Sequence, residues 1–146
     1  MNVYFDTSCL GRPFDDLSIA RNDAETKAIL AMLEMVQRGK LSLTISDVVL
    51  REIAATPQDL RRQQLIDIAG LANDVIRVSG KIRERGLELQ RRGFKAFDAL
   101  HVAVAEEAHV DRFCTADDRL RRRAAKQSDL NVRVVSVLEL FKELQS

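Results

Sequence analysis

The sequence predicts an α/β fold, a three-layer α/β/α sandwich around a mostly parallel sheet. Two observations support this prediction. Short strand-like apolar runs alternate along the chain with stretches of helical periodicity, and 46% of the 146 residues are hydrophobic. Strands that alternate with helices form parallel sheets covered on both faces. The length fits one domain, and no repeat or linker interrupts the chain, so we expect a single domain over residues 1–146.

The first half of the chain is expected to hold two strands, at 3–5 and 41–45, and three helices, at 24–36, at 46–56 and from 58 onward. The first strand is a run of β-favouring residues, and the second alternates apolar with polar residues. Apolar residues at helical spacing predict the 24–36 helix, which Gly39 ends. Ser46 is placed to cap the next helix, and Pro57 ends it.

The second half is expected to hold strands at 75–78, 112–115 and 132–135, and helices at 79–92, 95–109, 117–126 and 136–144. The 79–92 helix is rich in charge, and Gly93 separates it from the following helix. That following helix is apolar almost all round, which is typical of a buried helix. The last helix is amphipathic, so one of its faces is expected to pack on the sheet.

Most of the 22 acidic residues, Glu106 among them, fit a solvated surface, but a few lie where charges are rare. Asp6 follows the first strand and Asp117 follows strand 112–115. Ligands of open parallel sheets bind beyond the carboxyl ends of the strands. Helix capping is the competing interpretation, because Asp is a favoured N-cap residue and Asp117 and Asp118 stand at a predicted helix start.

Two more acids, Glu52 and Asp98, fall on the apolar sides of predicted helices. Glu52 comes four residues after Val48 and three after Val49, so it shares their helix face. A charge there needs a partner, a metal ion or an open cleft, unless the side chain reaches solvent at the edge of the face. Asp98 lies near the start of the apolar 95–109 helix, where either the helix dipole or a functional cleft would stabilise its carboxylate.

Asp6, Glu52, Asp98 and Asp117 could converge at one edge of the sheet. Carboxylates crowded into one cleft repel each other and raise each other's pKa values. A hard divalent cation relieves that repulsion, and carboxylates with water are suited to Mg²⁺ or Mn²⁺. The pattern therefore indicates phosphoryl or phosphodiester transfer by a metal-activated water.

Four parts of the chain together resemble the PIN domain family, and its VapC-type toxins in particular. They are VYFDTS at 3–8, the helix acid Glu52, FDALHVA at 97–103 and TADDRL at 115–120. The resemblance implies an α/β/α fold and a metal-dependent endoribonuclease that hydrolyses RNA. It implies Mg²⁺ or Mn²⁺ as cofactor, held by Asp6, Asp98 and Asp117, with Glu52 bound directly or through water.

The resemblance also implies supporting residues and partners. Ser8 stands where the family commonly has Asn or Ser, Thr115 is the hydroxyl residue before the last acid, and Asp118 is an additional neighbouring acid. A VapC-like toxin would have a small antitoxin partner and is often a homodimer. The segment Gly11–Arg21 departs from the commoner toxin pattern.

The histidines and cysteines are expected to be structural. His101 is interpreted as a histidine with satisfied partners in the core or on a helix face, and His109 as a helix-end residue. Cys9 and Cys114 fit small buried side chains, since no spacing suggests zinc or a disulfide framework. No signal-peptide pattern or membrane-spanning run occurs, so a cytoplasmic protein without membrane contact is expected.

Two other functions compete with a metal-dependent nuclease. A haloacid-dehalogenase-like phosphatase also has Asp after its first strand, but that family needs a second Asp two residues later, where this chain has Ser8. A catalytically silent PIN-fold module that binds RNA or a protein would keep the fold. The full set of acids argues against it, because phosphate-binding surfaces do not collect carboxylates without a metal.

The charges nearly balance, with 23 basic and 22 acidic residues and a formal net charge of +1. This balance excludes a polybasic nucleic-acid coat. The arginines are nevertheless clustered, and four of them follow Asp117 directly: Arg119, Arg121, Arg122 and Arg123. A solvated helix face is the competing interpretation. Beside an acidic metal site, these arginines are also placed to bind RNA phosphates.

Overall fold

The computed structural model describes all of residues 1–146 and contains one five-stranded sheet. Its strands are β1 (Asn2–Phe5), β2 (Ser42–Ser46), β3 (Asp74–Ile76), β4 (Arg112–Thr115) and β5 (Val134–Ser136). Every neighbouring pair is parallel, and the strand order is β3-β2-β1-β4-β5. The central strand β1 pairs with β2 and β4, so the loops after these three strands meet at one edge of the sheet.

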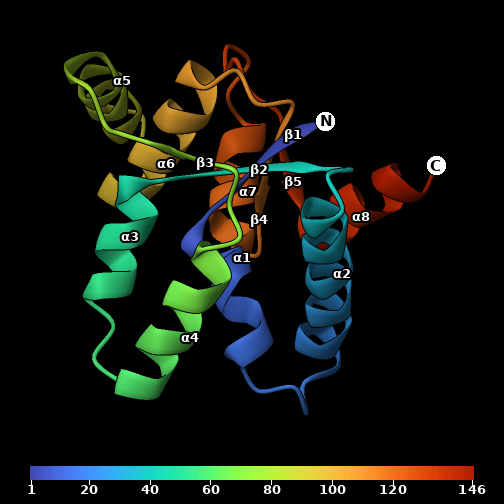
Figure 1. Ribbon diagram of the computed structural model, residues 1–146. Coiled ribbons are helices and arrows are strands. Elements are labelled where there is room, and N and C mark those ends of the chain that lie inside the picture. The colour runs from blue at the N-terminus through green and yellow to red at the C-terminus, as the bar shows by residue number, and fades with distance from the viewer.

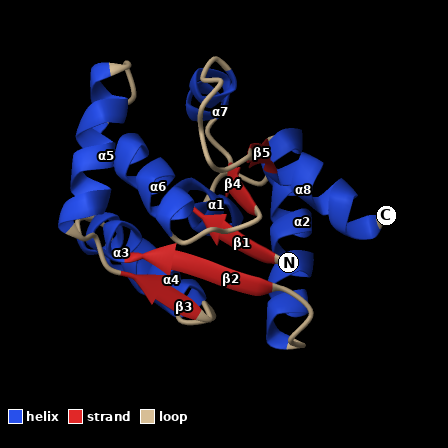
Figure 2. Cartoon of the chain, turned by 90° about the horizontal axis from the view of Figure 1, so that it is seen from above, coloured by secondary structure: helices blue, strands red, loops and turns tan.

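Eight helices surround the sheet: α1 (Thr7–Gly11), α2 (Ala20–Gln37), α3 (Asp47–Ala54), α4 (Asp59–Ala69), α5 (Gly80–Arg91), α6 (Ala96–Glu107), α7 (Asp118–Ala125) and α8 (Val137–Gln145). A short 3-10 turn, η1 (Arg12–Phe14), follows α1. Helices α2 and α4 lie on one side of the sheet, and α5 and α6 lie on the other (Figures 1 and 2). The predicted three-layer α/β/α sandwich is therefore confirmed. None of the helices combines the length and the apolar character that crossing a membrane requires.

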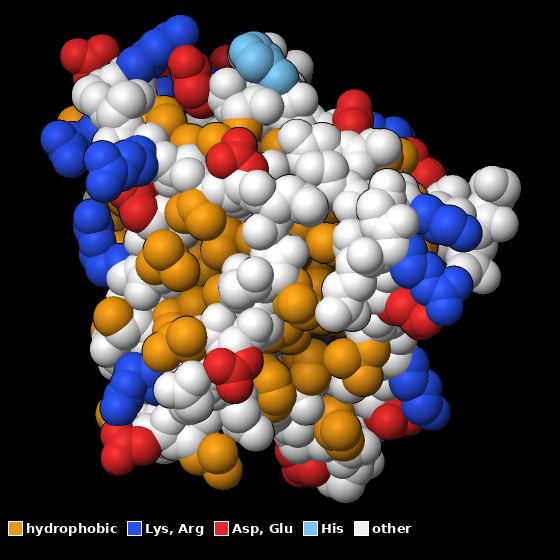
Figure 3. Space-filling view, in the orientation of Figure 1, with side chains coloured by type: hydrophobic (Ala, Val, Ile, Leu, Met, Phe, Trp, Pro, Cys, Tyr) orange, Lys and Arg blue, Asp and Glu red, His pale blue; other side chains and the backbone are white.

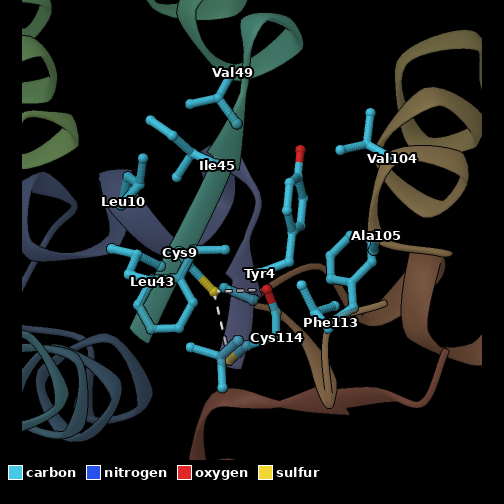
Figure 4. Packing of buried hydrophobic residues seen from close by; sticks show 14 of the residues in the cluster. Tyr4, Cys9, Leu10, Leu43, Ile45, Val49, Val104, Ala105, Phe113 and Cys114 are labelled. Atoms are coloured by element: carbon cyan, nitrogen blue, oxygen red, sulfur yellow. Dashed lines mark hydrogen bonds between the residues drawn. The ribbon is translucent and has the colours of Figure 1, made fainter. Parts of the chain in front are cut away.

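The core is one cluster of 37 buried apolar residues centred on β1, β2 and β4. Strands of a parallel sheet are buried on both faces, which explains why Val3, Tyr4 and Phe5 have no exposed surface. Cys9 and Cys114 are buried and free, as expected, with their Sγ atoms 3.7 Å apart (Figure 4). The Tyr4 ring packs edge-on against Phe113, with the ring centroids 5.1 Å apart.

The turn and the close packing between α5 and α6 set the position of Asp98, which lies in the first turn of α6. Gly93, in the turn between the two helices, has φ +103°, a conformation that only glycine adopts without strain. The helices then pack closely, since a Cβ added to Gly86 would lie 2.9 Å from Leu100 Cδ2. The turn therefore fixes the start of α6, whose first turn carries Asp98.

Some local expectations were wrong. The helix α1 and the turn η1 were not predicted, and β5 begins two residues later than the predicted 132–135 strand. Ser46 stands at the N-cap of α3 but makes no capping bond, because its hydroxyl bonds to Tyr4 instead. Glu106 is buried, not solvated, because Arg85 pairs with it through two hydrogen bonds of 2.8 and 3.0 Å.

Candidate active site

Asp6 is the most deeply placed acid of the site. It ends β1 and caps α1, and it is only 4% exposed. Its Oδ1 accepts hydrogen bonds from Ser8 Oγ (2.6 Å) and Cys9 N (3.2 Å), and its Oδ2 accepts one from Thr115 Oγ1 (2.6 Å). Burial raises the pKa of Asp6, although these hydrogen bonds act in the opposite direction. Asp6 is thus both the N-cap of α1 and one of the candidate acids of the site.

The two predicted supporting hydroxyls join β1 to the loop after β4. Ser8 Oγ accepts a hydrogen bond from Ala116 N at 3.0 Å and lies 3.3 Å from Thr115 Oγ1. Thr115 Oγ1 in turn accepts one from Asp117 N at 3.0 Å. Ser8 and Thr115 therefore fix Asp6 and the backbone of Asp117 relative to each other.

Asp98 interacts electrostatically with both Asp117 and Asp6. Burial raises the pKa of Asp98 to about 6, and the charges of Asp117 and Asp6 contribute to the rise. Asp117 caps α7, where its Oδ1 accepts from Arg119 N at 2.9 Å and Leu120 N at 3.4 Å. Its Oδ2 accepts no hydrogen bond from the protein, so this oxygen is available to a ligand.

Glu52 is held by Thr7 and His101. Its Oε1 accepts from Thr7 Oγ1 (2.8 Å) and lies 2.6 Å from His101 Nε2. Burial opposes the ionisation of Glu52, but the hydrogen bond and charge of His101 and the Thr7 hydroxyl bring its pKa below the ordinary value. Glu52 is therefore a carboxylate at neutral pH. His101 is buried with partners on both ring nitrogens, which confirms the expectation of a satisfied core histidine.

No three His, Cys, Asp or Glu side chains stand close enough together to hold a metal ion as they are oriented. The chemistry of the acids nevertheless fits a hard divalent cation, because carboxylate oxygens, together with water, are suitable ligands of Mg²⁺ and Mn²⁺. Burial is the largest cause of the raised pKa of Asp98, and the repulsion by Asp117 and Asp6 adds to it; a bound cation relieves such repulsion.

Two arginines that sequence reasoning missed brace the loop that carries Asp117. Arg12 Nη2 and Arg21 Nη2 each donate to the carbonyl oxygen of Ala116 at 3.3 Å. Both also pair with the buried Glu25 at 3.1 Å. They come from the segment Gly11–Arg21, which departs from the commoner toxin pattern. Only the i,i+4 spacing of Arg21 and Glu25 could have indicated part of this cluster.

Asp118, which the sequence indicated as a supporting acid, pairs with Arg21. Arg21 donates two hydrogen bonds to it, at 2.6 and 2.9 Å. The hydrogen bond from Arg21 is the largest cause of its pKa falling to about 2. Asp118 thereby holds the start of α7 against α2.

The four arginines of α7 differ in how they are engaged. Arg121 pairs with Asp118 (3.4 Å) and Glu139 (3.9 Å), and Arg123 donates to the carbonyl oxygen of Gly93. Arg119 and Arg122 are exposed, and their side chains make no hydrogen bond or ion pair within the protein. These two are free to bind an anion.

Comparisons with known proteins agree with this fold. The model of the PIN domain family matches residues 3–126. No protein of curated function matches the chain. The structure of VapBC2 from Rickettsia felis, bound to a DNA fragment from its promoter, is similar with a TM-score of 0.62 and 18% identity, over 93% of this chain and 98% of that chain.

Two further solved structures have the same fold. A toxin–antitoxin complex from Klebsiella pneumoniae gives a TM-score of 0.60 and 21% identity, over 92% of this chain and 97% of that chain. A protein from Pyrobaculum aerophilum gives 0.58 and 15% identity, over 99% and 90% of the two chains.

Proposed function

Because the chain belongs to the PIN domain family, we propose that it is a divalent-metal-dependent endoribonuclease that hydrolyses RNA phosphodiester bonds, with Mg²⁺ or Mn²⁺ as cofactor. One observation carries the proposal: Asp6, Asp98 and Asp117 interact at the carboxyl edge of the sheet, and burial together with their mutual repulsion raises the pKa of Asp98 to about 6. Carboxyl groups whose pKa values are raised in this way are typical of functional sites.

Each part of the site has a role in this proposal. Asp6, Asp98 and Asp117 would hold the cation, with Glu52 bound directly or through water. When bound, the cation supplies positive charge to the phosphate oxygens and makes a water molecule more acidic. Asp6 keeps its position because three donors fix its two oxygens. Arg119 and Arg122 would bind RNA phosphates beside the cleaved bond.

The test is RNA cleavage by the purified chain with Mg²⁺ or Mn²⁺, and with EDTA in parallel. Asp98→Asn should lower the rate by at least about 100-fold, because it removes one cation ligand and its charge. The matched control is Glu107→Gln on the same helix, an exposed acid remote from the site, which should cleave at the wild-type rate. Equal rates for wild type and Asp98→Asn, both correctly folded, would instead favour a catalytically silent module that binds RNA or a protein.

We propose further that this ribonuclease is the toxin of a toxin–antitoxin pair that acts in the cytoplasm, and that it forms a homodimer. The structures of VapBC2 and of the Klebsiella complex support this role by their likeness to the chain. A second support is an apolar groove of about 380 Å³ between α2 and α4, lined by Phe14, Leu30, Leu33, Ile68 and Leu71 among others. Apolar side chains also gather over the face that carries α2, α3 and α4 (Figure 3). Exposed apolar surface of this kind is typical of a protein interface.

Expression in a bacterial host tests the toxin role. Wild type should arrest growth, Asp98→Asn should not, and co-expression of a small protein encoded beside the chain should restore growth. Leu30→Glu, which puts a charge into the groove at a half-exposed position, should arrest growth as wild type does but escape that rescue. Normal growth with active wild-type protein would contradict the toxin role and leave the ribonuclease standing.

A further inference from the structure

A line of buried polar side chains reaches Glu52 from inside the core. Tyr4 Oη lies 2.7 Å from Ser46 Oγ and 2.6 Å from His101 Nδ1, and His101 Nε2 lies 2.6 Å from Glu52 Oε1. Tyr4, Ser46 and His101 are each no more than 2% exposed. The four residues come from β1, β2, α6 and α3, so the line connects four separate elements of the fold.

The donors and acceptors along this line follow from the end that is a carboxylate. An ionised carboxylate can only accept, so His101 Nε2 must carry a hydrogen and donate it to Glu52. Nδ1 is then engaged by the Tyr4 hydroxyl, which the Ser46 hydroxyl engages in turn. The Tyr4 ring is fixed by its packing in the core, and its hydroxyl points away from the Cys9–Cys114 pair (Figure 4). The imidazole ring is therefore fixed at both nitrogens, at Nδ1 by Tyr4 and at Nε2 by Glu52.

Both hydrogen bonds to Glu52 end on the same oxygen. Thr7 Oγ1 donates to Oε1, the atom that His101 also reaches, whereas Oε2 accepts no hydrogen bond from the protein. The Glu52 side chain is 28% exposed. Two donors thus fix one carboxylate oxygen of this partly exposed side chain and leave the other oxygen free.

We infer that Tyr4 and His101 are positioning residues, which together with Thr7 hold Glu52 so that its Oε2 is presented as an oxygen ligand for the divalent cation. This inference rests on the proposed function, because the cation is that of the proposed ribonuclease. Partners of metal-ligating side chains typically change metal affinity or activity by about 10- to 100-fold when they are removed.

The hydrogen placement is tested first, in the metal-free protein. Nitrogen-15 NMR of the His101 ring at neutral pH should show a hydrogen on Nε2, and its signal should change in Tyr4→Phe. A ring that carries its hydrogen on Nδ1 alone would overturn the inference, since such a ring cannot donate to Glu52.

The positioning role is tested by Mn²⁺ binding, followed by electron paramagnetic resonance, and by cleavage rate as a function of Mn²⁺. His101→Phe should raise the half-saturating Mn²⁺ concentration by about 10- to 100-fold. His101→Gln, whose side-chain amide can donate from near the position of Nε2, should recover most of that affinity. Tyr4→Phe should raise the Mn²⁺ requirement by less than His101→Phe does.

His109→Asn is the matched control, since His109 is the other histidine of α6 and its following turn and is exposed at positive φ, which Asn tolerates. It should bind Mn²⁺ as wild type does. A purely structural role would lower the melting temperature of His101→Phe and His101→Gln alike and leave their Mn²⁺ affinity unchanged, which would overturn the inference. If the wild-type protein neither binds Mn²⁺ nor cleaves RNA, the proposed function is overturned together with the inference. If the wild type is active and the variants bind Mn²⁺ as it does, only the inference is overturned.

Discussion

At the scale of single residues, the acids in and around the site fall into two kinds: those whose charged form is stabilised by partners, and those whose charged form is disfavoured by burial. Asp118 and Glu52 have partners that lower their pKa values, whereas Asp6 and Asp98 have raised values because burial disfavours their charge. An acid whose pKa is higher in the folded state than in the unfolded state weakens folding once the pH rises above its unfolded value. Asp98 is therefore expected to be a source of instability in the metal-free protein.

Replacing Asp98 by Asn should stabilise the metal-free protein near pH 7.5. The difference between the ordinary pKa of 3.8 and the folded value of about 6 corresponds to at most about 3 kcal/mol. Solvent screening at this half-buried side chain, together with the lost helix-dipole interaction, reduces the gain to about 1 kcal/mol. Thermal unfolding in EDTA should show a melting temperature about 3 °C higher for the variant at pH 7.5.

The gain should depend on pH with a definite sign. Stability is lost as the pH rises from about 4 to about 6, where Asp98 ionises in the unfolded chain before it does in the folded one. At pH 4 the difference between the variant and wild type should nearly vanish. Glu107→Gln should stay within about 0.5 kcal/mol of wild type at both pH values. A lower melting temperature for Asp98→Asn at pH 7.5 would show that the carboxylate has a partner.

At the scale of elements, a partly buried ion cluster around Glu25 connects the turn η1 and helix α2 to the loop between β4 and α7. Arg12 contacts Asp15, Asn22, Glu25 and the carbonyl oxygen of Ala116. The Glu25 side chain is only 3% exposed, and Arg12 and Arg21 are its two ion-pair partners. The cluster thereby fixes the loop on which Asp117 stands.

Arg12→Met should destabilise the protein by about 2–3 kcal/mol. Breaking a buried ion pair costs about 3–5 kcal/mol, and the expected loss is smaller here because Arg21 still pairs with Glu25. The measurement is unfolding in urea at neutral pH. Adding Glu25→Gln to Arg12→Met should recover part of the loss, because it removes a buried carboxylate that keeps only Arg21 as its ion-pair partner in the single variant.

The matched control is Arg38→Met, which removes an exposed i,i+4 pair with Glu34 and should cost less than about 0.5 kcal/mol. A loss for Arg12→Met no greater than that of the control would mean that the cluster does not stabilise the fold. A cleavage rate that falls with Arg12→Met in protein that remains folded would further link the cluster to the position of Asp117.

At the scale of the whole molecule, a net charge of +1 hides a separation of charge. Acids gather at the carboxyl edge of the sheet, and α7 places the exposed and unpaired Arg119 and Arg122 beside them. Many other basic residues, Arg85 and Arg92 among them, are engaged in ion pairs. The surface able to bind a nucleic-acid backbone is thus smaller than the number of basic residues suggests.

Changing both Arg119 and Arg122 to Gln should weaken RNA binding and lower its salt dependence. If each arginine neutralises one phosphate of a single strand, the slope of log affinity against log salt should fall in magnitude by about 1.4. The measurement is RNA binding between low and physiological salt with catalytically inactive protein. Changing Arg38 and Lys40 to Gln, at the opposite edge of the sheet before β2, should leave the slope unaltered. If the slope falls equally in the two double variants, the weaker RNA binding reflects the lower net charge and not a phosphate contact by Arg119 and Arg122.

The sequence by itself determined the order of the five strands and of the longer helices along the chain, and it gave the ends of β1 and β4 correctly. Hydrophobic periodicity is a local property, and the carboxyl ends of parallel strands meet at one edge, so the residue order indicated that Asp6 and Asp117 could converge at that edge. Tertiary structure decided the rest. His101 meets Glu52 across 49 residues, and Arg21 meets Asp118 across 97. Arg85 pairs with the buried Glu106, and the Ser46 hydroxyl forms a hydrogen bond with Tyr4 instead of capping α3. No local period specifies such contacts, because the packing of the layers sets which polar groups share the interior.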